Sequence, residues 1–171
     1  MDYLVAQKIF EHIRDRPYRV ATDPHTPADN CYFKSIELIK ELTGYGYTLR
    51  ARLGEIDWRD LPFLPDNIMA HYEHHTNTAH THFYPEIYID NEWRILDPSW
   101  NKAFAENYDL PFSVFGEENQ SCFKITKLYS HEEQIHYVSN WMNDAQKTKE
   151  FFSHTKEFFQ HVNDWLKRNN P

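Results

Sequence analysis

The chain has 171 residues, of which 40% are hydrophobic and 16% are aromatic, a composition that excludes a disordered protein and suits one domain over residues 1–171. Its formal charge of -8 argues against binding to nucleic acid through a basic surface. With only 4 glycines and 2 cysteines, it has little material for a glycine-rich phosphate loop or a disulfide framework.

The amino-terminal segment MDYLVAQKIFEHIRDR is amphipathic and charged throughout. It lacks the apolar block of a secretion signal, and no segment is long enough to span a bilayer. Together with the low cysteine count, these features predict a cytoplasmic protein that needs no membrane. One disulfide between Cys31 and Cys122 stays open as an alternative.

Two helices are predicted in the first 44 residues. The first spans residues 2–15, with Asp2 as its N-cap. The second begins at residues 29–30 and ends at Gly44, because Asp and Asn are good N-caps and Gly commonly follows a helix end. The predicted apolar stripe of this second helix consists of Tyr32, Ile36 and Ile39.

Beyond these helices the period of the sequence changes. Residues 45–58 alternate between polar and apolar side chains, which is typical of a strand. Residues 80–89 and 92–97 predict a β-hairpin around a tight turn. Residues 101–122 show no regular pattern, and a further short strand is possible over 122–128.

The last forty residues are predicted to be a helical extension over about 130–168, with Ser130 and Glu133 as a capping box. A short repeat, TKEFFSH followed by TKEFFQH, has a spacing of seven residues that nearly equals two helical turns. This spacing gathers one apolar face, made of Phe151, Phe152, Phe158, Phe159, Trp165 and Leu166. Packing in the core is the favoured interpretation, and binding of a partner is the alternative.

Cys31 is the first candidate for chemistry. It falls in the first turn of the second predicted helix, where free backbone N–H groups and the helix dipole favour a negative charge. A thiol there should be more acidic than usual, and an imidazolium nearby would lower its pKa further. A buried structural cysteine is the alternative interpretation, and it is the one favoured for Cys122.

The first strand of the hairpin begins with the end of a histidine-rich stretch, HYEHHTNTAHTH, at residues 71–82. Because side chains alternate along a strand, one face should carry the proton-exchanging groups, with a solvated polar face as the alternative. These groups are His80, His82, Tyr84, Glu86 and Tyr88. His82 is the preferred catalytic base and His80 the second choice, and the other histidines of the stretch are expected in a loop.

Asp97 completes the candidate site. With Asp90-Asn91 as a two-residue turn, Asp97 lies opposite Tyr84 and diagonal to His82. Diagonal neighbours are about 7–8 Å apart at the backbone, so the carboxylate can reach the imidazole, select its tautomer and favour its protonated form. A turn shifted by one residue would instead place Asp97 opposite Glu86, and a strand-end cap beside Pro98 is its alternative role.

The order of a cysteine at a helix start, a histidine on a strand and an aspartate at the end of the next strand resembles the transglutaminase-like superfamily of papain-type cysteine enzymes. The matching text is DNCYFKSIELIKELTGYGYTLRARLGE and HFYPEIYIDNEWRILDPSW, within about residues 28–104. The resemblance implies Cys31 as nucleophile, His82 as general base and acid, and Asp97 as the orienting carboxylate. Ala28-Asp29-Asn30 departs from the glycine often found before the cysteine, and Tyr84 from a frequent tryptophan.

We therefore expect an α+β fold with a transglutaminase-like or papain-like core, in which helices pack on one side of a small, mainly antiparallel sheet. The resemblance implies an enzyme that forms a thioester from an amide or ester carbonyl and passes the acyl group to water or to an amine. The substrate would be a protein, a peptide or a small amide, without nucleic acid, metal or organic cofactor. Hydrolysis is favoured, because no second substrate site is evident, and the Cys31 N–H is the expected oxyanion donor.

Two alternatives stay open. A non-catalytic binding domain could hold a partner through its aromatic cleft or through Phe151 and Phe158. A cupin-like metal protein could bind zinc or iron through His80, His82 and Glu86, although few glycines and long helices argue against such a barrel. His131, His136, His154 and His161 fall in predicted helices and are expected to be surface or packing residues.

Overall fold

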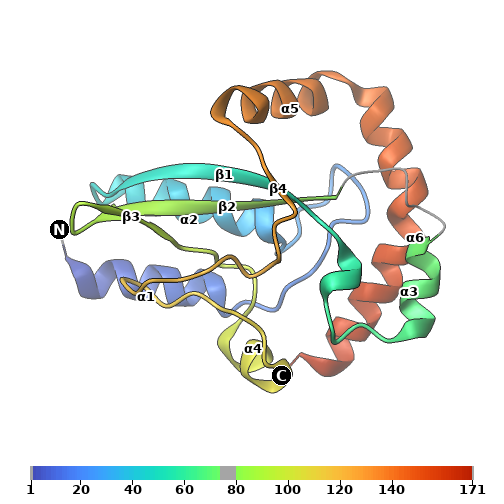
Figure 1. Ribbon diagram of the computed structural model, residues 1–171, viewed down its shortest axis with the longest axis horizontal. Helices are drawn as coiled ribbons and strands as arrows, with labels where there is room; N and C mark the ends of the chain where they lie inside the picture. Colours follow the sequence, from blue (N-terminus) through green and yellow to red (C-terminus); the bar gives the residue numbers. More distant parts are fainter. Residues whose placement is uncertain (1, 74–79, 171) are drawn as a thin grey trace.

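The computed structural model describes residues 2–73 and 80–170, and Figure 1 shows its arrangement. Its helices surround a small antiparallel sheet with the strand order β3-β2-β1-β4, so the α+β class is confirmed. The strands are β1 (Thr48–Ile56), β2 (His80–Ile89), β3 (Glu92–Ile95) and β4 (Lys127–Leu128). Among the described residues, no helix is both long and apolar enough to cross a membrane.

The described helices comprise six α-helices and one short 3-10 helix. They are α1 (Tyr3–Arg14), α2 (Cys31–Gly44), η1 (Trp58–Asp60), α3 (Asp66–Glu73), α4 (Lys102–Tyr108), α5 (His131–Asn143) and α6 (Ala145–Asn169). Helix α2 packs against β1 and β2 and against α1, while α3 packs against α6 (Figure 1). The predicted N-cap of α1 at Asp2, that of α2 at Asn30, and the capping box of α5 are all confirmed.

The predicted hairpin is confirmed in position and register. Ile89 pairs with Glu92 and Glu86 pairs with Ile95, as the two-residue turn requires. Asp90 and Asn91 have φ angles of 53° and 65°, the left-handed conformation that this turn needs and that Asp and Asn tolerate. The second strand ends at Ile95 rather than at residue 97, so Asp97 leaves the sheet.

The predicted apolar stripe of α2 was wrong. Tyr32 and Ile36 are exposed, and the face turned toward the sheet carries Lys34, Ser35, Leu38 and Leu42. Leu38 and Leu42 pack with α1 side chains and with Ile87 of β2. A stripe assigned by hydrophobicity alone fails here because a lysine and a serine occupy buried positions.

Lys34 is buried because its ammonium group finds three backbone acceptors. Nζ donates to the carbonyl oxygens of Arg14, Arg16 and Ser99 at 2.9, 2.5 and 3.2 Å. Burial lowers the pKa of Lys34 to about 7, although the attraction of Asp29 opposes this shift. The three acceptors favour the charged form, because only an ammonium group has three hydrogens to donate. The side chain thereby joins α2 to the segment after α1 and to the chain beyond β3.

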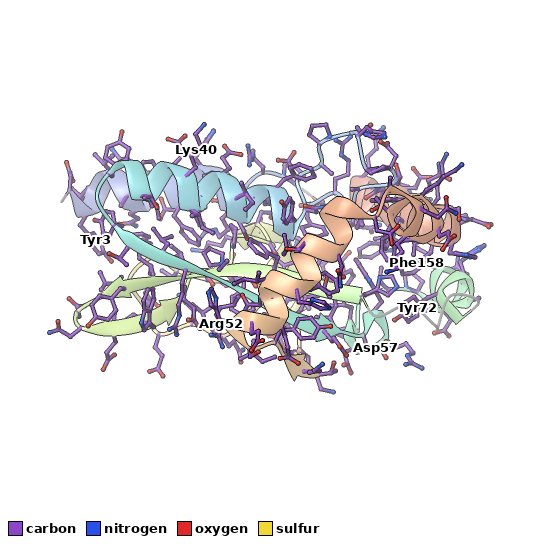
Figure 2. The ribbon with its side chains drawn as sticks, turned by 90° about the horizontal axis from the view of Figure 1, so that it is seen from above. Tyr3, Lys40, Arg52, Asp57, Tyr72 and Phe158 are labelled. Atoms are coloured by element: carbon purple, nitrogen blue, oxygen red, sulfur yellow. The ribbon has the colours of Figure 1, made fainter. Side chains whose placement is uncertain are left out.

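Replacing Lys34 by methionine should lower the free energy of unfolding by about 3–5 kcal/mol, because it leaves carbonyl groups without donors in the interior. Urea denaturation followed by circular dichroism measures this change. Lys40→Met is the matched control, since Lys40 is exposed on the outer side of the same helix (Figure 2). Equal midpoints for the two variants would show that the Lys34 contacts contribute nothing.

Two helices, α3 and α4, lie in segments for which the sequence predicts no helix. Each has only seven or eight residues, which is too few to show a clear apolar period. Helix α3 is held in place by two buried side chains, Ile68 and Tyr72. The possible strand over 122–128 is reduced to β4, whose two residues pair with Gly54 and Glu55. His71 belongs to α3 and not to a loop.

The aromatic repeat of α6 packs in the core, as expected. Phe158, Phe159 and Leu166 are buried, while Phe151 and Trp165 pack partly buried against the same cluster. This cluster also contains Tyr18, Trp58 and Phe123 and fills the space between α6, η1, α3 and the irregular chain. Because Phe158 has no exposed surface, it cannot hold a partner, and that part of the binding-domain alternative was wrong.

Candidate active site

Cys31 is the first residue of α2 and lies at the wall of a cavity. The side chain of Asn30 caps the helix by accepting from the N–H of Phe33, which sets the direction in which the chain enters the first turn. Cys31 is half-buried and forms no disulfide, and Cys122 is a free, buried cysteine. The thiol is thus held by a well-capped helix end and stays within reach of the cavity.

His82 and Asp97 form a buried pair. Nε2 of His82 lies 2.6 Å from Oδ2 of Asp97, and neither side chain has exposed surface. The Nδ1 atom of His82 has no hydrogen-bond partner of good geometry among the described residues. It is therefore the ring nitrogen left to serve the Cys31 thiol, and such contacts are often loose before a substrate binds.

Several donors converge on Asp97. Oδ1 accepts from the hydroxyl and the N–H of Ser99 at 2.7 and 3.1 Å, and Oδ2 accepts from the N–H of Cys122 at 2.8 Å. The N–H of Asp97 donates to the hydroxyl of Ser113. Burial alone would raise the pKa of Asp97, but the charge and hydrogen bond of His82, with these donors, lower it. Asp97 is therefore an ionised, rigidly held carboxylate.

Asp97 affects the pKa of His82, and His82 in turn affects the pKa of the Cys31 thiol. Burial would lower the pKa of His82, but the attraction and hydrogen bond of Asp97, with the contact to Cys31, raise it to about 10. Burial would raise the pKa of the Cys31 thiol, but His82 and the N–H of Phe83 outweigh burial and lower it. These opposite directions favour the pair of thiolate and imidazolium over the pair of neutral thiol and neutral imidazole.

Two polar side chains of α2 form hydrogen bonds to the segments that carry His82 and Asp97. The hydroxyl of Ser35 donates to the carbonyl oxygen of Phe83, next to His82, at 3.1 Å. Lys34 bonds the carbonyl oxygen of Ser99, the residue that holds Asp97. The three candidate residues therefore come from segments that are joined by buried hydrogen bonds, which keeps their geometry stiff.

The cavity beside Cys31 has a volume of about 380 Å³. Its walls are mostly apolar and come from the segment after α1, from β1 and η1, and from α6. The apolar residues lining it include Val20, Leu53, Ile56, Trp58, Phe151 and Phe159. A long or aromatic apolar group would lose water on entering this space, which is the expected driving force for binding there.

Tyr18 is a member of the site that the sequence analysis missed. It is buried against Trp100, and its hydroxyl interacts with both the thiol and the N–H of Cys31. Burial and the nearby Cys31 raise the pKa of Tyr18 well above its usual value, so the hydroxyl keeps its proton. No local pattern around Tyr18 distinguishes it, since its role depends on a contact with the following helix.

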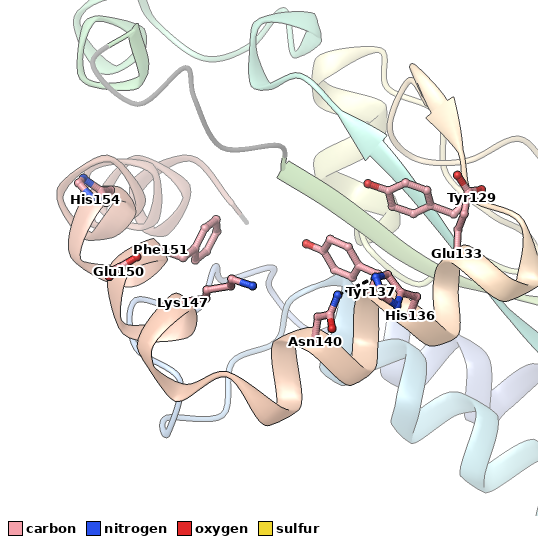
Figure 3. A pocket seen from close by; sticks show the side chains of 9 residues that line it. All are labelled: Tyr129, Glu133, His136, Tyr137, Asn140, Lys147, Glu150, Phe151 and His154. Carbon is pink, nitrogen blue, oxygen red and sulfur yellow. Dashed lines mark hydrogen bonds between the residues drawn. The ribbon is translucent and has the colours of Figure 1, made fainter.

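A second cavity, of about 630 Å³, lies between α5 and α6 (Figure 3). Its lining residues include the polar and charged side chains Glu133, His136, Lys147 and Glu150. Tyr137 and Phe151 line both cavities, and Figure 3 shows these two rings between the helices. A second hollow therefore adjoins the cavity of Cys31, and the preference for hydrolysis, based on the absence of an evident second substrate site in the sequence, stays a prediction.

The alternative of a cupin-like metal site formed by His80, His82 and Glu86 was wrong. His80 accepts a hydrogen bond from Nε1 of Trp58 through its Nδ1, and Glu86 pairs with Arg50 of the neighbouring strand. His82 faces Asp97 instead of sharing an ion with these two residues. The solvated polar face was also wrong, because His80, His82 and Tyr84 are buried. His74 and His75 lie outside the described residues.

Comparison of the chain with protein-family models, with curated proteins and with solved structures found no match. Function is therefore inferred from the geometry of Cys31, His82 and Asp97 and from the two cavities.

Proposed function

We propose that the protein is a cysteine-dependent acyl-transfer enzyme with a transglutaminase-like core. The observation that carries the proposal is the buried His82–Asp97 pair, 2.6 Å apart, whose free Nδ1 is left for a thiol at a helix start. A purely structural cysteine would need neither an ionised carboxylate behind the histidine nor a cavity in front of the sulfur. The three residues together meet the requirements of an activated nucleophile.

The proposed reaction has two steps. The Cys31 thiolate attacks the carbonyl carbon of an amide or ester, and the negative charge moves to the carbonyl oxygen. The hydroxyl of Tyr18 is the proposed donor to this oxygen, because the N–H of Cys31, the donor expected from the sequence, interacts with that same hydroxyl. His82 gives its proton to the leaving amine or alcohol, which leaves a thioester on Cys31. His82 then takes a proton from water or from an amine, which attacks the thioester and frees the thiol.

The two cavities suggest where each part of the substrates binds. The apolar cavity beside Cys31 suits the acyl group, and the adjoining cavity, with charged side chains in its wall, has room for the leaving or accepting group. Transfer to an amine therefore has the same structural support as hydrolysis.

Activated aryl esters test this proposal directly. The protein would be incubated with p-nitrophenyl esters whose acyl chains range from acetyl to octanoyl, and the intact mass and the labelled peptide would be measured. We expect an acyl adduct on Cys31 that forms faster with the longer chains, because these bury more apolar surface. Added primary amines would then show what fraction of the acyl group passes to water and what fraction passes to the amine. No adduct, or one that forms only at other residues, would refute the proposal.

The pH dependence of turnover follows from the same pair. The pKa of His82 is raised, so the ring is protonated below about pH 10 and loses its proton above it. With an amide substrate, whose amine must be protonated to leave, turnover should fall as the pH rises through about 10, because His82 can then no longer supply that proton. Alkylation of Cys31 needs only the thiolate and should not fall in that range. A turnover rate that keeps rising above pH 10 would contradict the assigned role of His82.

A further inference from the structure

A cluster outside the proposed active site joins two helices that are far apart in the sequence. His71 of α3 and His161 of α6 stack with ring centroids 4.1 Å apart, and Nδ1 of His71 lies 3.4 Å from Oε1 of Glu157. One donor atom from each of these residues falls within 4.8 Å of the other two. Glu157 and His161 are four residues apart on α6, so they project from the same side of the helix.

The donor set suits a borderline divalent cation. Zinc takes imidazole nitrogen at about 2.0–2.1 Å and carboxylate oxygen at about 2.0–2.2 Å, and tetrahedral angles place two such ligands about 3.3–3.5 Å apart. The distance between His71 and Glu157 already has this value. An ion pair explains that contact alone but does not explain a second imidazole stacked on the first. Closing the site would require rotation of these side chains from a separation of up to 4.8 Å to that distance.

The helices that carry the cluster are firmly packed beneath it. Tyr72 of α3 lies beside Phe158 of α6, with ring centroids 5.1 Å apart (Figure 2). The cluster therefore sits on an existing helix contact, so little backbone movement would be needed to close it around an ion. Helix α6 also supplies Phe151 and Phe159 to the cavity beside Cys31.

We propose that His71, Glu157 and His161 form a zinc site, with solvent as the fourth ligand, that clamps α3 to α6. This site is separate from the proposed catalytic residues and takes no part in the acyl transfer. Its effect is to stabilise the wall of the apolar cavity against opening. The proposal does not depend on the enzyme assignment, since metal binding can be measured without any substrate.

Titration calorimetry of the metal-free full chain with zinc chloride at neutral pH tests the site. We expect one zinc per chain, and a rise of about 5–10 °C in Tm at a free zinc concentration of 100 times Kd. His71→Ala and His161→Ala should each weaken zinc binding by more than about 100-fold. This exceeds the usual effect of losing a residue that only hydrogen-bonds to a metal ligand. His154→Ala is the matched control on the same helix and should bind as the wild type does.

A His74→Ala/His75→Ala double variant separates this cluster from the neighbouring histidines of the sequence. Wild-type zinc binding in the double variant, with loss in His71→Ala and His161→Ala, supports the site. Loss of binding in the double variant, full binding in both single variants, or weak binding without a fixed stoichiometry would overturn it. Circular dichroism of each variant without metal would verify that α3 and α6 remain folded.

Discussion

Replacing Cys31 by alanine is expected to abolish the acyl adduct and to lower turnover by about 10⁴-fold or more, since a thioester needs a cysteine and the other one, Cys122, is buried. The fold should persist, because Cys31 is only half-buried and its helix is capped by Asn30. The rate of ester cleavage and the mass of the acylated protein measure the effect.

Cys122→Ala is the matched control for labelling. Cys122 is buried, and burial raises the pKa of its thiol well above the usual value, so iodoacetamide should not reach it in the folded protein. Its removal should cost about 1–2 kcal/mol of stability through lost packing and leave labelling of Cys31 unchanged. The enzyme assignment would fail if Cys31→Ala still formed the adduct, or if Cys122 were the residue that reacts.

Asp97→Asn should produce the second large effect. The amide would keep the shape of the side chain but remove the charge that raises the pKa of His82. It could also donate to Nε2, which would place the ring proton on Nδ1 and prevent that atom from accepting a proton. A substitution of this kind at an orienting carboxylate costs about 10⁴-fold in turnover. Loss of the buried ion pair should lower the free energy of unfolding by about 3–5 kcal/mol.

Asp90→Asn is the control for this substitution. Asp90 is exposed at the hairpin turn with φ of 53°, and asparagine tolerates the same left-handed conformation. The control should keep wild-type turnover and stability. If Asp97→Asn retained turnover within about threefold of the wild type, a role limited to capping the strand end would account for Asp97 and the triad would be wrong.

Local signals predicted the parts of the fold that carry the candidate site. Asn30 capped the helix that begins with Cys31, and Asp90-Asn91 set the turn and with it the pairing of the hairpin. Because pairing in a hairpin is set by the turn, the approach of Asp97 to His82 could be predicted before any tertiary contact was known.

The features that escaped prediction depend on distant parts of the chain. Lys34 is buried only because Arg14, Arg16 and Ser99 offer carbonyl oxygens, and hydrophobicity cannot foresee that arrangement. The N–H of Cys122 reaches Asp97 from 25 residues away, out of a segment without regular structure. A spacing of four, Lys34-Leu38-Leu42, was the one local signal that could have revealed the buried face of α2.

The rate of iodoacetamide alkylation at Cys31 between pH 5 and 10, in the wild type and in His82→Ala, shows whether His82, held ionised by Asp97, keeps Cys31 as a thiolate near neutral pH. We predict fast wild-type labelling that persists well below pH 8.5, the usual pKa of a cysteine, and a shift of the His82→Ala profile to higher pH. Two coincident profiles, each rising like that of an ordinary thiol, would show that His82 does not activate Cys31.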